Sequence, residues 1–158
     1  MSDILNFQRA GAISNAHVGR EFEQIAQKVL QSKSINVHQN FPLEIGVGKV
    51  KKRHAFDLGC ADQKIIVECK SHRWTSGDKV PSAKLTVWNE AMYYFYLAPV
   101  EFRKIMFVLH DVSQKRALSL ADYYKDKYRH LIPDDVEFWE LNTTDASFKI
   151  TQPKGNLQ

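Results

Sequence analysis

The most constraining feature of this sequence is the order in which helix-type and strand-type hydrophobic patterns follow one another. Apolar residues recur at helical spacing, with steps of three and four, in the ranges 15–31, 82–97 and 118–131. Short patterns typical of strands lie between and after them, at 35–45, 54–60, 64–70, 105–109 and 136–141. This order predicts an α/β fold in which a mixed sheet lies between helices.

Several connections sharpen this prediction. The range 105–109 is apolar at every position, as expected of a strand that is covered on both faces. Only Ala61, Asp62 and Gln63 separate the two strand patterns before it, a spacing that suits an antiparallel hairpin. The range 71–81 has no periodicity and predicts a long loop. We expect a single domain over 1–158, with a core at about 15–141 and peripheral arms at 1–14 and 142–158, the second a loosely held tail.

Composition excludes several classes of protein. No stretch approaches the roughly 20 apolar residues that cross a bilayer, and the N-terminus lacks the pattern of a secretory signal. The two cysteines, Cys60 and Cys69, and the six histidines show none of the paired spacings of a zinc site. We therefore expect a cytoplasmic protein with free thiols and no membrane partner. The net charge of +4 favours polyanions without demanding them.

Chemically active side chains gather at the end of the strand pattern 64–70. Because side chains alternate along a strand, Glu68 and Lys70 share one face while Val67 and Cys69 share the other. If the preceding strand pairs with this one, Asp57 lies beside Glu68. Two adjacent carboxylates repel each other unless a proton or a cation lies between them, and hard oxygen ligands suit Mg²⁺ or Mn²⁺.

The spacing of Asp57 and the tripeptide from Glu68 to Lys70 resembles the motif of the PD-(D/E)xK nuclease superfamily. That family shares a core of helix, three strands, helix and strand, which matches the order read from periodicity over about 18–109. The resemblance implies a restriction endonuclease-like three-layer sandwich with core order αβββαβ, followed here by a C-terminal helix and strand. One departure is Phe56, where the name-giving motif has proline.

The resemblance also implies roles for individual residues. Asp57, Glu68 and the backbone carbonyl of Cys69 would bind one or two Mg²⁺ or Mn²⁺ ions, and Lys70 would position or deprotonate water. The implied activity is hydrolysis of DNA phosphodiester bonds in repair, recombination or restriction, with RNA not excluded. A homodimer that cuts two strands is a further expectation from the family.

The family often carries an acidic residue on its first helix after a small residue, and two residues compete for this place. Glu23 follows Gly19 by four positions, so the two share a side of the helix with Ala26, where small residues allow a close approach to the sheet. Glu21 lies on the flank with Lys28. We therefore expect Glu23 to contribute to the active site, as an outer-sphere or second-metal ligand.

Candidate contacts to nucleic acid flank the motif. Clustered cations bind phosphates through counterion release, and an arginine–tryptophan pair can grip a phosphate or stack on a base. Charge runs more often only solvate a surface, and the tryptophan could equally cap the core. The histidines are given no role. The residues expected to contact nucleic acid are Lys51, Lys52, Arg53, Arg73, Trp74 and Lys84.

Two other interpretations stay open. A lone Glu-x-Lys occurs roughly once by chance in a chain of this length, so the motif is informative mainly through its placement after an apolar strand and a hairpin. The fold could be retained in a catalytically inactive protein that binds nucleic acid. Alternatively, the chain could be an α/β protein-interaction domain unrelated to nucleic acid. Salt-dependent DNA binding separates this last interpretation from the others.

Overall fold

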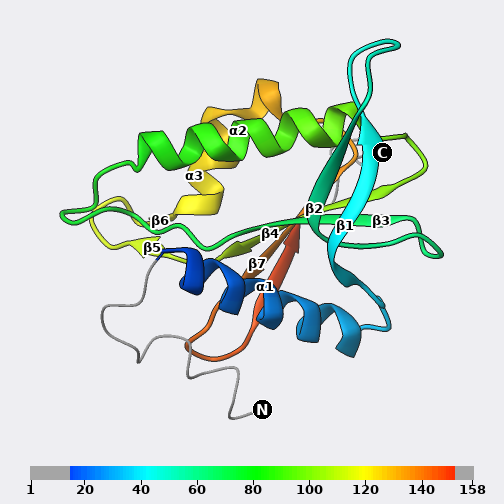
Figure 1. Cartoon of the computed structure of the whole chain (residues 1–158). Coiled ribbons are helices and arrows are strands. Elements are labelled where there is room, and N and C mark those ends of the chain that lie inside the picture. Colours follow the sequence, from blue (N-terminus) through cyan, green and yellow to red (C-terminus); the bar gives the residue numbers. More distant parts are fainter. Residues whose placement is uncertain (1–14, 152–158) are drawn as a thin grey trace, which may run out of the picture.

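A six-stranded mixed sheet forms the centre of the protein (Figure 1). The structure is a computed structural model and describes residues 15–151. The sheet has the order β1-β2-β3-β4-β7-β8, in which β3, β4 and β7 are parallel and the other neighbours are antiparallel. Its strands are β1 (His38–Ile45), β2 (Lys52–Cys60), β3 (Ile65–Lys70), β4 (Arg103–Leu109), β7 (Val136–Leu141) and β8 (Phe148–Thr151).

Helices cover both faces of this sheet. Helix α1 (Asn15–Ser32) lies on one face, and α2 (Ser82–Leu97) and α3 (Leu120–Lys127) lie on the other (Figure 1). A single turn of 3-10 helix, η2 (Arg129–Leu131), follows α3. The α/β class and the mixed sheet between helices are therefore confirmed. No helix in the range 15–151 is long and apolar enough to cross a membrane.

Each face of the sheet has its own hydrophobic cluster. On the α1 side, Phe22 and Leu30 pack with Phe107 of β4, and the rings of Phe22 and Phe107 lie 5.6 Å apart. On the α2 side, Trp88 and Phe95 are fully buried among residues of β2, β3, β4 and β7. The helical stripes read from the sequence thus face the sheet. Burial of each large side chain of this kind stabilises the fold by about 1.5–3 kcal/mol.

The third helix is shorter than the helical pattern at 118–131 predicts. Two short strands, β5 (Val112–Ser113) and β6 (Leu118–Ser119), form a small hairpin just before it. The hydroxyl of Ser119 accepts a hydrogen bond from the Asp122 amide at 3.1 Å, which caps the first turn of α3. The serine cap fixes the start of the helix two residues later than periodicity suggests, and η2 replaces its last turn.

The part of the expected tail that the structure describes, 142–151, contains a strand, whereas 152–158 and the expected arm 1–14 lie outside the described residues. Strand β8 pairs antiparallel with β7, with Leu141 opposite Phe148 and Phe138 opposite Thr151. The ring of Phe148 stacks on that of Trp139 at 5.8 Å. This pairing with the buried strand β7 supplies hydrogen bonds and apolar contact that the polar composition of the segment does not reveal.

Strand β2 bends sharply at Asp57. It pairs with β1 along most of its length, but with β3 only from Leu58 to Cys60. Phe56 packs in the cluster on the α2 side, whereas Leu58, two residues later, packs in the cluster on the α1 side. Residues two apart in a regular strand share a face, so the chain must turn between them. On β1, Asn40 has a φ of 53° at the same level, a left-handed conformation that asparagine tolerates.

Candidate active site

The bend in β2 creates the candidate site. Upstream of Leu58 the two strands are no longer paired, and the backbone amide of Cys69 on β3 donates instead to the Asp57 carboxylate. The distance from the Cys69 nitrogen to Asp57 Oδ2 is 2.8 Å. Where the strands separate, the Asp57 side chain thus takes the place of a backbone carbonyl of β2 as the acceptor for the Cys69 amide. This hydrogen bond anchors Asp57 beside the end of β3.

Glu68 and Lys70 extend from β3 toward the same place. Ile66 packs on the α2 side while Val67 and Cys69 pack on the α1 side, which confirms the expected alternation along the strand. Lys70 Nζ lies 3.3 Å from Glu68 Oε2, and both side chains are mostly buried. A carboxylate and an ammonium are thus held together at the carboxyl end of β3.

Glu23 reaches the same group of charges from helix α1. Burial raises the pKa of its carboxyl, Lys70 opposes this rise, and the negative charge of Glu68 adds to it. Glu23 therefore lies within electrostatic reach of Glu68 and Lys70, as the small-residue side of α1 predicts. Glu21 is half-buried on the same helix and has contacts of its own.

Electrostatic coupling within this group is strong. Burial and the negative charge of Glu68 raise the pKa of Asp57 to about 7, although Lys70 and the Cys69 amide oppose the rise. Burial by itself would lower the pKa of Lys70, but Glu68 and Asp57 together raise it above its ordinary value. The lysine is therefore an ammonium at neutral pH, whereas Asp57 is only partly ionised there because its pKa lies at about 7.

The site offers two carboxylates to a hard divalent cation, but the described residues do not offer a complete set of protein ligands. In the range 15–151 no group of three or more histidine, cysteine, aspartate or glutamate side chains is arranged to hold a metal ion. Magnesium sites commonly use only one or two carboxylates and complete their coordination with water and substrate phosphate. Asp57 and Glu68 are such a pair, and the raised pKa of Asp57 marks a place where added positive charge would be stabilising.

Residues without a role in the sequence interpretation complete the surroundings of Glu68. His54 Nε2 lies 3.2 Å from Glu68 Oε1, and its ring stacks on Tyr94 of α2 with centroids 3.9 Å apart. The Tyr94 hydroxyl donates to Glu90 Oε1 at 3.1 Å. His54 lies three positions before Asp57 on β2. This proximity in sequence was the one feature that could have indicated that His54 lies near the site. The contact with α2 could not be read from the sequence.

His72, just beyond the motif, serves as a hydrogen-bond acceptor. Its Nδ1 accepts from the indole nitrogen of Trp88 at 2.8 Å. Burial, reinforced by the positive charges of Lys70 and Lys84, lowers the pKa of His72 to about 4. The ring is therefore neutral at physiological pH, and it links the loop after β3 to the core under α2.

The residues expected to contact nucleic acid fall into different environments. Arg73 pairs with Asp111 at 3.3 Å, and Lys84 is exposed near the start of α2. Trp74 is only 8% exposed, and its ring packs against Tyr123. It offers no free face to a base in this structure, so the alternative of a core cap fits its placement. The cations at the start of β2, all exposed, are Lys51, Lys52 and Arg53.

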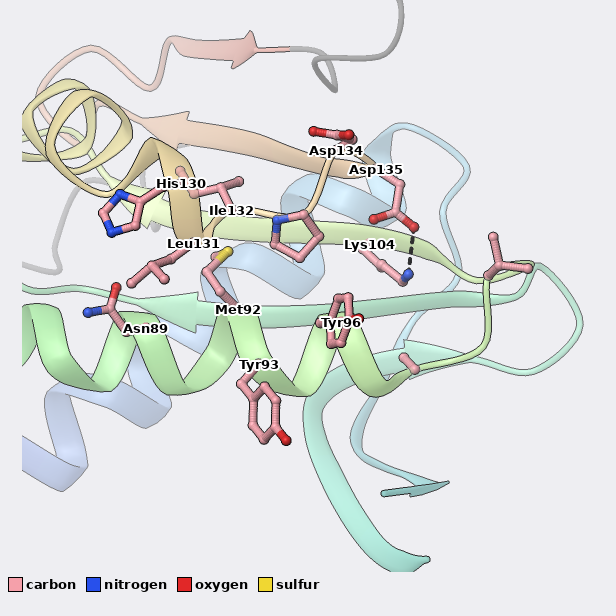
Figure 2. Close-up of a pocket in the computed structure, with 13 residues that line it drawn as sticks. Asn89, Met92, Tyr93, Tyr96, Lys104, His130, Leu131, Ile132, Asp134 and Asp135 are labelled. Atoms are coloured by element: carbon pink, nitrogen blue, oxygen red, sulfur yellow. Dashed lines mark hydrogen bonds and ion pairs between the residues drawn. The ribbon is translucent and has the colours of Figure 1, made fainter. Parts of the chain in front are cut away.

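A separate cavity of about 770 Å³ lies between α2 and the segment 130–135 (Figure 2). Tyr93 and Tyr96 line its outer side, and Lys104 forms an ion pair with Asp135 inside it at 2.5 Å. None of the residues that converge at the end of β3 lines this cavity. The candidate site lies instead at the fork between β2 and β3, where its charged side chains are mostly buried.

Scanning the chain against models of known protein families gives no match, and comparison with curated proteins gives none either.

Proposed function

We propose that this protein is a divalent-metal-dependent nuclease that hydrolyses phosphodiester bonds in DNA. The observation that carries the proposal is the convergence of Asp57, Glu68 and Lys70 at the fork between β2 and β3, with Glu23 near them on α1. The element order from α1 to β4 is helix, three strands, helix and strand. It supports the finer assignment to the restriction endonuclease-like, PD-(D/E)xK type.

Three groups would hold the metal. These are the carboxylates of Asp57 and Glu68 and the backbone carbonyl of Cys69. The N–H and C=O of one strand residue point to the same edge of the strand. Since the Cys69 amide is directed at Asp57, we infer that its carbonyl is directed to the same edge of β3. The buried Cys69 thiol, whose pKa is raised well above its ordinary value chiefly by burial, belongs to the core on the α1 side.

When bound, Mg²⁺ or Mn²⁺ supplies Lewis-acid polarisation of the scissile phosphate and lowers the pKa of a coordinated water. The raised pKa of Lys70 favours its acting as a fixed ammonium, which orients water and balances charge, over its acting as a base. Glu23 lies within electrostatic reach of this group and is proposed to bind the metal through a water molecule. His54 contacts Oε1 of Glu68 and Lys70 contacts Oε2, and the two contacts together fix the orientation of that carboxylate.

The test is a cleavage panel with plasmid, linear duplex, single-stranded, branched and RNA substrates in Mg²⁺ or Mn²⁺. We expect Lys70→Ala to reduce cutting by about 10²- to 10³-fold, the loss typical when one group that stabilises transition-state charge is removed. Lys127→Ala, which removes an exposed lysine at the end of α3, is the matched control and should cut normally.

Two outcomes would contradict the proposal. Equal cutting by Lys70→Ala and by the unaltered protein would assign the activity to a contaminant. Silence of the unaltered protein on every substrate, together with salt-dependent DNA binding, would instead support an inactive nucleic-acid-binding protein.

A further inference from the structure

We propose that the hairpin formed by β1 and β2 enters the major groove of duplex DNA, with Val47 and Val50 against the base edges. The hairpin arm is defined as residues 41–56, the part of the two strands beyond the bend at Asp57. Figure 1 shows its loop projecting beyond the layer of α2. The proposal rests on the proposed function, because the active site determines where the DNA lies.

The tip of the hairpin arm is a closed loop that holds two valines in solvent. Val47 is 64% exposed and Val50 is 80% exposed. The Val50 amide donates to the Val47 carbonyl at 3.2 Å, and Lys51 Nζ donates to the Gly46 carbonyl at 2.9 Å. A Cβ on Gly46 would lie 1.9 Å from the Val50 carbonyl oxygen. The loop therefore has a defined shape that presents apolar side chains outward, which is unfavourable in water unless a partner covers them.

Charge concentrates on the same hairpin arm. Its ionisable side chains other than histidine are Glu44, Lys49, Lys51, Lys52 and Arg53. With histidine counted as neutral, this gives the arm a net charge of +3, whereas the whole chain carries only +4. The register places the single acid, Glu44, directly opposite Arg53 and leaves the lysines to dominate the tip. An apolar tip flanked by cations complements a groove in which base edges lie between two rows of phosphates.

The hairpin arm is a two-stranded ribbon that begins beside the active site. His54, at its base, contacts Glu68. Val50 lies seven residues from Asp57, and at no more than about 3.3 Å per residue the tip is within roughly 23 Å of the site. The major groove is about 12 Å wide and admits a two-stranded ribbon, whereas the minor groove is only about 6 Å wide. A scissile phosphate at the site therefore places the adjacent major groove within reach, where valine methyl groups can meet thymine methyl groups.

The experiment measures the affinity of Asp57→Asn protein, which should not cut, for a thymine-rich duplex and for the same duplex with uracil in place of thymine. We expect V47S/V50S to weaken binding to the thymine duplex about tenfold, as expected when two partly buried valines lose their apolar contact. The matched control is V87S/V100S, which changes two exposed valines outside the arm and should bind within about twofold of the parent. Loss of the thymine methyl groups should weaken the parent about threefold and leave V47S/V50S unchanged.

Each outcome is decisive. If V47S/V50S binds as tightly as the parent, or still distinguishes thymine from uracil, the groove assignment is wrong even where the unaltered protein cuts DNA. If the unaltered protein neither binds nor cuts any duplex, the proposed function fails and this inference fails with it. Valine-dependent binding to vesicles of phosphatidylcholine and phosphatidylserine, without an effect on DNA, would assign the tip to a membrane surface and overturn the inference.

Discussion

Replacing Asp57 by asparagine is expected to stabilise the metal-free protein at alkaline pH. Burial and Glu68 raise the pKa of this carboxyl from 3.8 to about 7. The folded state therefore binds a proton more tightly than the unfolded state, and stability is lost as pH rises through the folded-state pKa. At 1.36 kcal/mol per pKa unit, the full cost of ionisation above pH 7 is roughly 4 kcal/mol. Asparagine mimics the protonated carboxyl and can still accept the bond from the Cys69 amide.

The assay is urea unfolding of both proteins in EDTA at pH 5 and pH 8. Between these values the unaltered protein should lose about 2–3 kcal/mol relative to Asp57→Asn, because part of the cost is already present at pH 5. Carboxyl groups outside the site titrate alike in both proteins and cancel in the difference. Mg²⁺ should stabilise the unaltered protein at pH 8 and leave Asp57→Asn nearly unaffected. A stability difference that is the same at both pH values would refute the electrostatic reasoning.

Substitutions at three further positions test other contacts in the structure. Trp74→Phe removes a buried indole N–H that has no hydrogen-bond partner among the described residues, so it should raise the urea midpoint or leave it unchanged; a loss above about 1 kcal/mol would contradict this. Gly46→Ala places a methyl group against the Val50 carbonyl and should lower thermal stability by about 1–3 kcal/mol, whereas an unchanged melting temperature would mean that the loop is easily displaced. His54→Ala should reduce cutting about tenfold, while His54→Gln should retain more activity because an amide can still donate to Glu68. If both variants cut as fast as the unaltered protein, His54 has no role in the site.

The candidate site was partly readable from the sequence. Alternation along β3 indicates that Glu68 and Lys70 share a face, and the short turn before β3 indicates that Asp57 lies nearby. The side of α1 that carries Glu23 follows from helical periodicity. These inferences were possible because each depends on residues close together in the sequence. The contact of His54 with Glu68 and Tyr94 depends on where α2 lies over the sheet, and no local pattern contains that information.

Local periodicity by itself determined the α/β class, because the spacing of apolar residues records which side of each helix and strand is buried. Only the tertiary structure decided that β2 bends at Asp57, that β8 joins the sheet beside β7, and that a serine cap shortens α3. Each of these features depends on hydrogen bonds, and which groups become partners depends on how the whole chain folds. The bend matters most, because the separation of β2 from β3 leaves the Cys69 amide for Asp57 and so holds Asp57 near Glu68 and Lys70.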